Sequence, residues 1–390
     1  MMQQPQPLHQ TRRSFLLKAT QGAAVASLAS VIPAVASAAQ TTPKQQKLPP
    51  DQKLGWAIVG LGEFATNQLI PAFPLCKKSK LVALVSGDPA KAQRIAAANG
   101  IPEKNIYNYQ NYDSLKDNPD VDVIYIVLPN NMHAEYTIRG AQAGKHIMCE
   151  KPMATSVEDC RKMIDACNKA GRKLMIAYRA QYEPFNKEAI RLTQNGDLGK
   201  IRMVTSDHGR ILDPSKPADK WRADKKMAGG GSLMDIGIYS LNATRYLTGE
   251  EPEEVQAFIH SAPNDPRFKE VEENVNFILR FPSGILASCT SSYGFHETKR
   301  FSVFGSEARL DLEPATDYYE HEMKITSKEG TQQKKIKEES QFALEIDHMS
   351  ECVMENKTPK TPGEEGLQDL RLITAIYEAA EKGKPVAIKS

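Results

Sequence analysis

The sequence predicts an α/β protein in two parts: an N-terminal doubly wound Rossmann domain, followed by an α+β C-terminal domain with a large open, mostly antiparallel sheet. Three observations favour this fold class. Short apolar segments alternate with amphipathic helical segments between Leu54 and residue 176, as in a parallel sheet covered on both faces. A glycine-rich turn, "GLGEFA" at 60–65, follows the first apolar segment. Beyond residue 176, longer segments of period two succeed one another without helices between them, which is typical of antiparallel pairing.

Length and composition limit the classes of protein to consider. The 390 residues exceed one ordinary core, and a composition of 41% hydrophobic and 25% charged residues is that of a soluble globular chain. A net charge of +2 argues against a nucleic-acid partner, which would need a clustered basic surface. We expect four segments: a signal peptide at 1–38, an extended polar arm at 39–52, a Rossmann domain at 53–176 and a substrate-binding and oligomerisation domain at 177–390.

The N-terminus has the three parts of an export signal. Arg12 and Arg13 precede "SFL", an alanine-rich stretch follows, and Ala36-Ser37-Ala38 offers small residues to a peptidase. The alternative to a signal peptide is a short membrane anchor. Polar residues and Pro33 interrupt the alanine-rich stretch, so it would make a poor membrane-spanning helix. We therefore expect export by the twin-arginine machinery to the periplasm, and no membrane span in the mature protein.

Six cysteines would suggest disulfides in an exported protein. However, Cys149 ends a predicted buried strand, and Cys160 and Cys167 lie too far apart on one predicted helix to bridge. Because the twin-arginine route carries proteins already folded in the reducing cytoplasm, we expect buried free thiols and no structural disulfide.

The sequence of the first domain predicts alternating strands and helices. The predicted strands are 55–59, 81–86, 123–128 and 146–149, and the predicted helices are 89–99, 133–143 and 157–170. In the turn after the first strand, Gly60 permits a tight bend, Gly62 lets the backbone approach a pyrophosphate, and Ala65 is small enough for helix–strand packing. Pro71 and Pro74 should shorten or kink the helix that follows.

The end of the second strand bears on the choice of cofactor. An NAD enzyme usually places a carboxylate there to hold the ribose 2′-hydroxyl, whereas this chain has Ser86 and Gly87, with Lys91 one turn into the next helix. These residues could receive a 2′-phosphate, which a carboxylate at position 86 would repel. The pattern favours NADP; Asp88 keeps NAD as the alternative.

Two stretches leave strand ends at the crevice where doubly wound sheets bind ligands. In "VLPNNMH" (127–133), Pro129 and Asn130 are expected near the cofactor, while His133 is expected to cap or pack at the next helix start. In "CEKPM" (149–153), Lys151 stands before a proline at the same edge, where it could bind a substrate hydroxyl and lower its pKa, and that of a neighbouring tyrosine.

A second constellation lies in "AGGGSLMDIGIY" (228–239). The three glycines are expected to form a flexible segment that leads into a helix, and Ser232 can cap that helix. Asp235 and Tyr239 are one helical turn apart, so they should project from one face toward one ligand. The carboxylate could orient a sugar hydroxyl, and the phenol could carry a proton.

The later segments predict the second sheet. Its strands are expected at 201–209, 254–260, 274–281, 285–293 and 300–305, and an amphipathic helix at 364–383 should end at Gly383. One face of this sheet should cover the active site, and the other is a candidate for subunit pairing. The lysine-rich run 328–340 reads as a solvated hairpin or loop.

Taken in order, the glycine turn, "VSGDPAK", "LPNNMHAE", "AGKHIMCEKPMATS" and "GGGSLMDIGIY" resemble the family of glucose–fructose oxidoreductases, inositol dehydrogenases and rhizopine-catabolism oxidoreductases, and within it the periplasmic, NADP-containing glucose–fructose oxidoreductase branch. The likeness runs from about Leu54 almost to the C-terminus and includes "PGEEG" at 362–366.

The resemblance implies roles for individual residues. Lys151 would be the catalytic lysine, Tyr239 the acid–base residue where many relatives use histidine, and Asp235 a substrate ligand, with Arg179 in the sugar pocket. Ser86, Lys91 and Tyr109 would hold the adenosine phosphate end. The expected cofactor-binding residues are Gly60, Leu61, Gly62, Ser86, Gly87, Lys91, Tyr109, Leu128, Pro129, Asn130, His133, Glu150, Lys151, Trp221 and Arg222. No metal site is expected.

The chain departs from the branch at two points. Its arm is shorter than the proline-rich arm by which some relatives cover a neighbouring subunit's adenine, and "AYRAQYEP" at 177–184 places Ala180 and Gln181 in the pocket. Subunit assembly, expected as a dimer or tetramer, and substrate preference can both differ as a result.

An exported nicotinamide enzyme needs a cofactor that stays bound, because the periplasm is not expected to maintain a pool of free NADP(H). We therefore expect tightly bound NADP, reduced by one aldose at C1 and reoxidised in place by a second sugar. The alternatives are a conventional sugar or inositol dehydrogenase with a dissociable cofactor, and a sugar-binding protein without activity.

Overall fold

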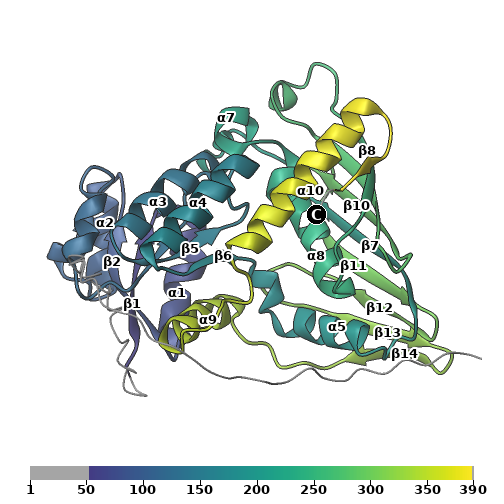
Figure 1. The fold of residues 1–390 in the computed structure, drawn as a ribbon, viewed down its shortest axis with the longest axis horizontal. Coiled ribbons are helices and arrows are strands. Elements are labelled where there is room, and N and C mark those ends of the chain that lie inside the picture. The colour runs from purple at the N-terminus through teal and green to yellow at the C-terminus, as the bar shows by residue number, and fades with distance from the viewer. Residues whose placement is uncertain (1–51, 389–390) are drawn as a thin grey trace, which may run out of the picture. The chain divides into compact units, whose positions relative to one another are not determined.

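The computed structural model describes residues 52–388, all of which belong to one compact unit spanning Lys47–Ser390. The predicted signal peptide and nearly all of the predicted arm lie outside the described residues. Two sheets organise the described part (Figure 1). The predicted fold class is confirmed: a parallel Rossmann sheet is followed by a large, mostly antiparallel one.

The first sheet has six parallel strands in the order β3-β2-β1-β4-β5-β6. The strands are β1 (Leu54–Val59), β2 (Ser79–Val85), β3 (Ile106–Tyr107), β4 (Val123–Ile126), β5 (His146–Glu150) and β6 (Leu174–Ala177). The helices around it are α1 (Ile70–Ala72), α2 (Pro89–Ala98), α3 (His133–Gln142) and α4 (Val157–Ala170). The four strands expected from the sequence are present, whereas β3 and β6 were not expected.

Both faces of this sheet are buried. Ala57 and Ile124 belong to the core on the side of α3 and α4, while Trp56 and Tyr125 point into a second core with α2 and α9 (Gln341–Met354). Helix α9 therefore returns from the C-terminal half of the chain to cover the Rossmann sheet (Figure 1).

Local chemistry fixes the ends of several helices. At the start of α4, Ser156 Oγ accepts a hydrogen bond from Asp159 N at 3.1 Å, and Gly171 ends the helix with a left-handed φ of 64°. The helix after the glycine turn is broken as expected near Pro71 and Pro74, into a π-helical turn at Ala65–Leu69, α1, and a 3₁₀ turn at Phe73–Leu75.

The second sheet has nine strands in the order β14-β13-β12-β11-β7-β10-β9-β8-β15. The strands are β7 (Ile201–Gly209), β8 (Glu254–His260), β9 (Asn274–Arg280), β10 (Leu286–Ser292), β11 (Thr298–Gly305), β12 (Ala308–Leu312), β13 (Met323–Ser327), β14 (Gly330–Lys334) and β15 (Val386–Ala387). All neighbours pair antiparallel except β7 and β10. The lysine-rich run begins in the exposed β13–β14 hairpin.

Helices cover one face of the second sheet (Figure 1). They include α5 (Pro184–Gln194), α8 (Ile238–Thr248) and α10 (Gly363–Lys382), and two short helices, α6 (Pro217–Lys220) and α7 (Lys225–Ala228), precede α8. Helix α10 ends at Gly383, with φ of 60°, as expected. The other face carries exposed apolar side chains: Phe258 is 70% exposed and Ile278 is 47% exposed.

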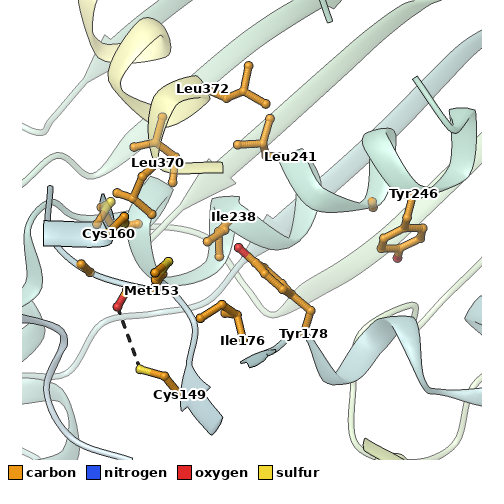
Figure 2. Close-up of a cluster of buried hydrophobic side chains, with 14 of the residues drawn as sticks. Cys149, Met153, Cys160, Ile176, Tyr178, Ile238, Leu241, Tyr246, Leu370 and Leu372 are labelled. Atoms are coloured by element: carbon orange, nitrogen blue, oxygen red, sulfur yellow. Dashed lines mark hydrogen bonds between the residues drawn. The ribbon is translucent and has the colours of Figure 1, made fainter. Parts of the chain in front are cut away.

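One buried cluster joins elements of both halves of the described chain. Figure 2 shows Cys149 of β5, Cys160 of α4, Ile176 of β6, Ile238 of α8 and Leu370 of α10 meeting there. Each of these side chains is at most 2% exposed. All six cysteines are buried free thiols. Among residues 52–388, no helix is long and apolar enough to cross a membrane.

Candidate active site

The glycine turn lies at the carboxyl ends of the paired strands β1 and β4. Gly60 has φ of 96°, and a Cβ there would lie 2.2 Å from the Val127 carbonyl oxygen, so only glycine fits. A Cβ on Gly62 would meet no atom within 4 Å. The backbone at Gly62 therefore borders open space, as close approach of a pyrophosphate requires. Leu61 beside it is buried, and so is Ala65, the small residue at the third position.

Residues expected at the adenosine end come together after β2. A Cβ on Gly87 would lie 3.0 Å from the Tyr109 ring, and the hydroxyl of Ser86 accepts a hydrogen bond from Asp88 N at 3.1 Å. The Asp88 carboxylate accepts one from Lys91 N at 3.0 Å and caps α2. One oxygen of this exposed carboxylate therefore caps its own helix, and the NAD alternative stays open at this strand end.

The loop after β4 is held by its own contacts. Leu128 is buried, Pro129 is half-buried, and Asn130 Nδ2 donates to the Ala228 carbonyl oxygen at 2.8 Å. His133 is 0% exposed, and its ring nitrogens lie 2.8 Å from the Leu128 oxygen and 2.9 Å from the Pro152 oxygen. This burial leaves His133 no surface with which to contact a nucleotide, so it ties two loops together instead of binding the cofactor directly.

Lys151 stands at the end of β5 and reaches the segment that contains Asp235 and Tyr239. Its Nζ donates to the Asp235 backbone oxygen at 2.7 Å and lies 3.8 Å from the Asp235 carboxylate. The same Nζ is 4.6 Å from the centre of the Tyr239 ring. Burial lowers the pKa of Lys151, although Asp235 and Glu150 oppose that shift. The structure thus brings together the three residues for which catalytic roles were predicted.

Asp235 is held as an anion by a cluster of donors. Its Oδ2 accepts hydrogen bonds from Tyr293 Oη at 2.9 Å, Arg222 Nε at 3.0 Å and Arg210 Nη2 at 3.5 Å. Burial favours a higher pKa for Asp235, but Arg222, Lys151 and Arg210 together hold it well below its usual value. With Oδ2 occupied, Oδ1 is the oxygen that faces Lys151 and could accept from a ligand hydroxyl.

Tyr239 is packed among cations. The Arg179 guanidinium carbon lies 5.0 Å from the centre of the Tyr239 ring. The His208 ring, which is neutral, stacks on the Tyr239 ring with the two centres 5.6 Å apart. Burial raises the pKa of Tyr239, and Arg179 is the cation that opposes this shift. The expectation that Lys151 lowers the Tyr239 pKa stays a prediction: the net pKa is raised, and Arg179 is the cation that most strongly opposes this rise.

The start of the helix that carries Asp235 differs from expectation. Leu233–Gly237 forms a π-helical turn leading into α8, and Ser232 Oγ pairs with Ser291 Oγ at 3.0 Å instead of capping. The half-buried Glu272 carboxylate accepts from Gly231 N at 2.7 Å and Leu233 N at 3.0 Å, so a carboxylate from a distant loop caps this segment.

The glycines before this helix serve close packing. A Cβ on Gly231 would lie 2.0 Å from the Glu272 carbonyl oxygen, and one on Gly230 would lie 2.2 Å from the Tyr377 hydroxyl. These two positions need glycine because backbone and side chains approach closely, not because the segment must be flexible.

The remaining predicted residues surround this centre. Trp221 is half-buried under the Arg222 guanidinium, 4.5 Å away, and Arg222 also contacts Asp219 at 3.6 Å. Arg179 is buried and donates to the Thr316 oxygen and to Gln341 Oε1, both at 2.6 Å. Arg179 therefore lies behind Tyr239, whereas Lys151, Asp235 and Tyr239 keep some exposed surface.

Several contributors were not expected from the sequence. They are Arg210, Tyr293, Glu272, His208, Tyr125 and Glu345, which come from strands, loops and helix α9, distant in sequence, and lie in no local motif. A polar residue within an apolar segment, such as Tyr125 or Glu345, is the one signal that could have pointed to them. Within the described residues, no group of three or more His, Cys, Asp or Glu side chains could hold a metal ion.

A Rossmann sheet with a lysine at the end of one strand, in contact with an aspartate and a tyrosine, is typical of a nucleotide-dependent oxidoreductase. The chain belongs to the family of glucose–fructose oxidoreductases, inositol dehydrogenases and rhizopine-catabolism oxidoreductases. Residues 54–178 match the oxidoreductase family with an NAD-binding Rossmann fold, and residues 187–388 match the C-terminal alpha/beta domain of that family.

Individual relatives cover most of the chain. The crystal structure of an aldose–aldose oxidoreductase from Caulobacter crescentus, complexed with glycerol, is 48% identical, with a TM-score of 0.83 over 86% of this chain and 99% of that one. An NADP⁺ D-xylose 1-dehydrogenase from Haloarcula marismortui is 32% identical over 88% of this chain and 96% of its own length. A second NADP⁺ D-xylose 1-dehydrogenase, from Haloferax volcanii, is 30% identical over 85% of this chain.

Proposed function

We propose that this chain is a sugar oxidoreductase with tightly bound NADP, which oxidises one aldose at C1 to a lactone and reduces a second sugar, a ketose or an aldose, to an alditol. The observation that carries the proposal is the Lys151–Asp235–Tyr239 cluster beside the carboxyl end of β5. The aldose–aldose oxidoreductase at 48% identity supports the choice of substrates.

The residues of the crevice fit NADP. The open space beside Gly62 suits a pyrophosphate, and the Ser86–Gly87–Tyr109 corner can receive a 2′-phosphate while Asp88 is engaged in capping α2. Lys91 extends from the first turn of that helix. When bound, NADP would accept a hydride from one sugar and supply it to the next.

The protein's own side chains would move the proton. In the oxidising half-reaction the C1 O–H bond breaks and its proton passes to the Tyr239 oxygen, while the C1–H bond breaks with loss of hydride. Arg179 stabilises the phenolate needed for this step, because it is the cation that lowers the Tyr239 pKa. Lys151 donates to the substrate oxygen, and Asp235 Oδ1 accepts from a neighbouring hydroxyl. In the reducing half-reaction Tyr239 returns its proton to the carbonyl oxygen of the second sugar.

The decisive experiment concerns the cofactor. The purified protein, dialysed extensively, is denatured and its small-molecule contents are examined by mass spectrometry. We expect NADP at about one per chain, and we expect sugar to change the nicotinamide absorbance without added coenzyme. Protein that arrives empty and needs coenzyme in the assay would overturn the proposal.

A conventional NADP-dependent sugar dehydrogenase is the second candidate, favoured by the D-xylose 1-dehydrogenases at 32% and 30% identity. The same dialysis separates the two functions, because a dissociable cofactor is lost and activity then depends on added NADP.

Export is a further part of the proposal and rests on Arg12 and Arg13. Replacing both by lysine should retain the protein in the cytoplasm, whereas Lys18→Arg should not. Cell fractionation distinguishes these outcomes, and equal periplasmic yield of all variants would contradict twin-arginine export.

Self-association is proposed through the outer face of the second sheet. Phe258, Ile278 and Leu286 are 70%, 47% and 46% exposed there, and such a patch is typical of an interface. Phe258→Glu should lower the mass measured by light scattering to that of a monomer, with Lys169→Glu on the exposed side of α4 as control. An unchanged mass would refute this face as the interface.

A further inference from the structure

The half-buried Glu150, which precedes Lys151 in the chain, and the buried Glu345 share the hydroxyl of one tyrosine, Tyr125. Tyr125 on β4 donates to Glu150 Oε1 at 2.6 Å, and the same hydroxyl lies 3.4 Å from Glu345 Oε1 on α9. Tyr125 and Glu345 are each 0% exposed. The second oxygen of Glu345, Oε2, has no hydrogen-bond partner among the described residues.

The number of hydrogens available to Tyr125, Glu150 and Glu345 indicates which of the two carboxyl groups is protonated. A phenol carries one proton, and the much shorter contact assigns it to Glu150. The contact between Tyr125 and Glu345 then contains a hydrogen only if Glu345 supplies it. An ionised Glu345 would instead be a buried carboxylate with one oxygen against a phenol lone pair and the other without a partner, which is very costly.

The surrounding charges indicate the same arrangement. Glu150 is influenced by two cations, Lys151 and Arg179, whereas Glu345 is influenced by Arg179 alone. Burial raises the pKa of Glu150 too, but the hydrogen bond from Tyr125 and the charges of Lys151 and Arg179 oppose that rise. Burial and the charge of Glu150 raise the pKa of Glu345 well above its usual value. Tyr182, the other titratable group near Glu345, has a pKa raised by burial and stays neutral.

We propose that Glu345 is a protonated positioning residue: its O–H donates to Tyr125, whose O–H donates to Glu150, and this chain of hydrogen bonds fixes a single negative charge on Glu150. That charge favours the charged form of Lys151 and the protonated form of Tyr239. The consequence for catalysis rests on the proposed function, whereas the protonation itself does not.

The chain offers a matched set of variants on one helix. In Glu345→Gln the amide N–H₂ can donate to Tyr125 in place of the carboxylic O–H, whereas in Glu345→Leu nothing can. Glu351→Gln is the control, because Glu351 is an exposed glutamate of α9 that pairs with Lys78 at 3.3 Å.

The first measurement is the infrared difference spectrum between the wild-type protein and each variant, at pH 6 and pH 9. We expect the carbonyl stretch of a protonated carboxylic acid to be lost in Glu345→Gln at both pH values and kept in Glu351→Gln. A wild-type spectrum in which Glu345 contributes only carboxylate bands would overturn the proposal.

The second measurement is the pH profile of kcat/KM for sugar oxidation. Without a donor to Tyr125, its bond to Glu150 weakens, Glu150 takes up a proton more readily, and the profile shifts to lower pH. We expect Glu345→Leu to change the rate at fixed pH by about tenfold, and Glu345→Gln to keep the wild-type profile. A glutamine variant displaced as far as the leucine variant would overturn the positioning role. If no sugar reacts but the infrared band is present, the proposed function fails and the protonation of Glu345 stands.

Discussion

The proposed chemistry depends on the hydroxyl group of Tyr239, and the surroundings of this group have two opposing effects on its pKa. Burial keeps the phenol protonated, while Arg179 favours the phenolate. A group that gives a proton in one half-reaction and takes it in the other needs both forms within reach. Tyr239 lies near two cations, Lys151 and Arg179, and could meet that need without a second acid–base residue.

Tyr239→Phe should abolish both half-reactions, because the ring packing is kept while the proton carrier is lost. We expect turnover to fall by about 10²- to 10⁴-fold, with folding and cofactor content unchanged. Tyr246→Phe is the control, since Tyr246 lies on the same helix and donates to Asn186 Oδ1 at 2.8 Å, away from the cluster. Comparable turnover in Tyr239→Phe and wild type would contradict the assignment.

The raised pKa of Tyr239 predicts different pH dependences for the two half-reactions. Sugar oxidation needs the phenolate, so its rate should rise with pH throughout the range from 6 to 9. Carbonyl reduction needs the phenol, which stays protonated over that range, so its rate should not fall for lack of the acid. Rapid mixing with one sugar at a time, followed by nicotinamide absorbance, measures each rate. An oxidation rate that is flat from pH 6 to pH 9 would argue against Tyr239 as the base.

Among the residues of the site, those that stand in a local motif could be predicted from the sequence, and those without such a motif could not. Lys151 and Tyr239 stand in short motifs beside strand or helix ends, where position implies a role. Arg210 and Tyr293, which hold Asp235, come from the ends of β7 and β10. These two strands become neighbours only through their parallel pairing, and no local sequence pattern predicts that pairing.

Among the elements, the segment that carries Asp235 shows how tightly the site is built. The π-helical turn Leu233–Gly237 starts against Glu272, whose carboxylate and carbonyl oxygen both contact it. Because Gly231 sits against that carbonyl oxygen, the packing of one loop fixes where the helix begins and hence where Asp235 points.

Gly231→Ala and Gly62→Ala form a matched pair for this idea. The Cβ at 231 meets the Glu272 oxygen at 2.0 Å, so that variant should have a lower melting temperature and lower activity. The Cβ at 62 meets no atom within 4 Å, so that variant should melt like the wild-type protein when both are cofactor-free, yet retain less NADP. Calorimetry and cofactor content distinguish the two effects. Equal melting temperatures for both variants would contradict the close approach at Gly231.

Long, strongly patterned elements were predictable, and short or irregular ones were not. The bounds of α4, β7 and β8 agree with the sequence prediction because caps and regular burial define them. The two-residue strands β3 and β15 carry too little pattern to detect. Helix α9 was missed because it buries Glu345 and Ser350 among its apolar residues, which disguises the amphipathic pattern.

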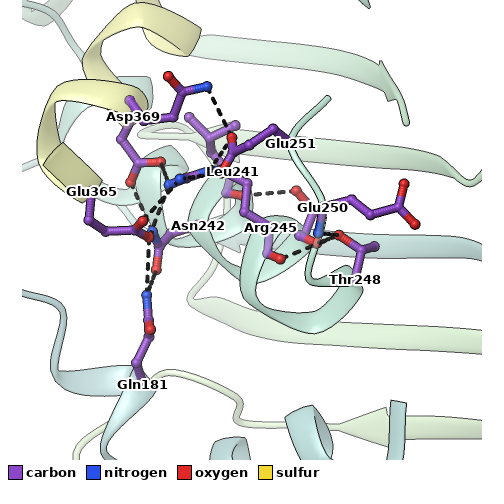
Figure 3. A network of polar contacts seen from close by, with 11 residues as sticks. Gln181, Leu241, Asn242, Arg245, Thr248, Glu250, Glu251, Glu365 and Asp369 are labelled. Atoms are coloured by element: carbon purple, nitrogen blue, oxygen red, sulfur yellow. Dashed lines mark hydrogen bonds and ion pairs between the residues drawn. The ribbon is translucent and has the colours of Figure 1, made fainter. Parts of the chain in front are cut away.

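For the molecule as a whole, a buried ionic network joins α8 to α10 (Figure 3). Arg245 is 4% exposed at its side chain and pairs with Asp369 at 2.6 Å, Glu365 at 3.0 Å and Glu251 at 2.6 Å. Three carboxylates therefore share one guanidinium. Burial raises the pKa of Asp369 to about 7, with Arg245 opposing the shift and Glu365 adding to it.

This network makes stability depend on pH. The folded pKa of Asp369 lies above its unfolded value of 3.8, so its protonated form contributes stability that is fully present below about pH 4 and is lost as pH rises through 7. Arg245→Met should therefore be most harmful where Asp369 is ionised. We expect it to lower the free energy of unfolding by about 3–5 kcal/mol at pH 8, and by clearly less at pH 5, where Asp369 takes up a proton.

Urea unfolding at the two pH values measures this difference, with Arg300→Met as the control. Arg300 is 53% exposed at its side chain and pairs with Asp207 at 3.0 Å, so its loss should cost no more than about 1 kcal/mol at either pH. A loss for Arg245→Met that is the same at pH 5 and pH 8 would mean that Asp369 keeps its charge throughout. In that case the network would act as a permanent ion pair between α8 and α10, and the stability of the molecule near neutral pH would have to be governed by other groups.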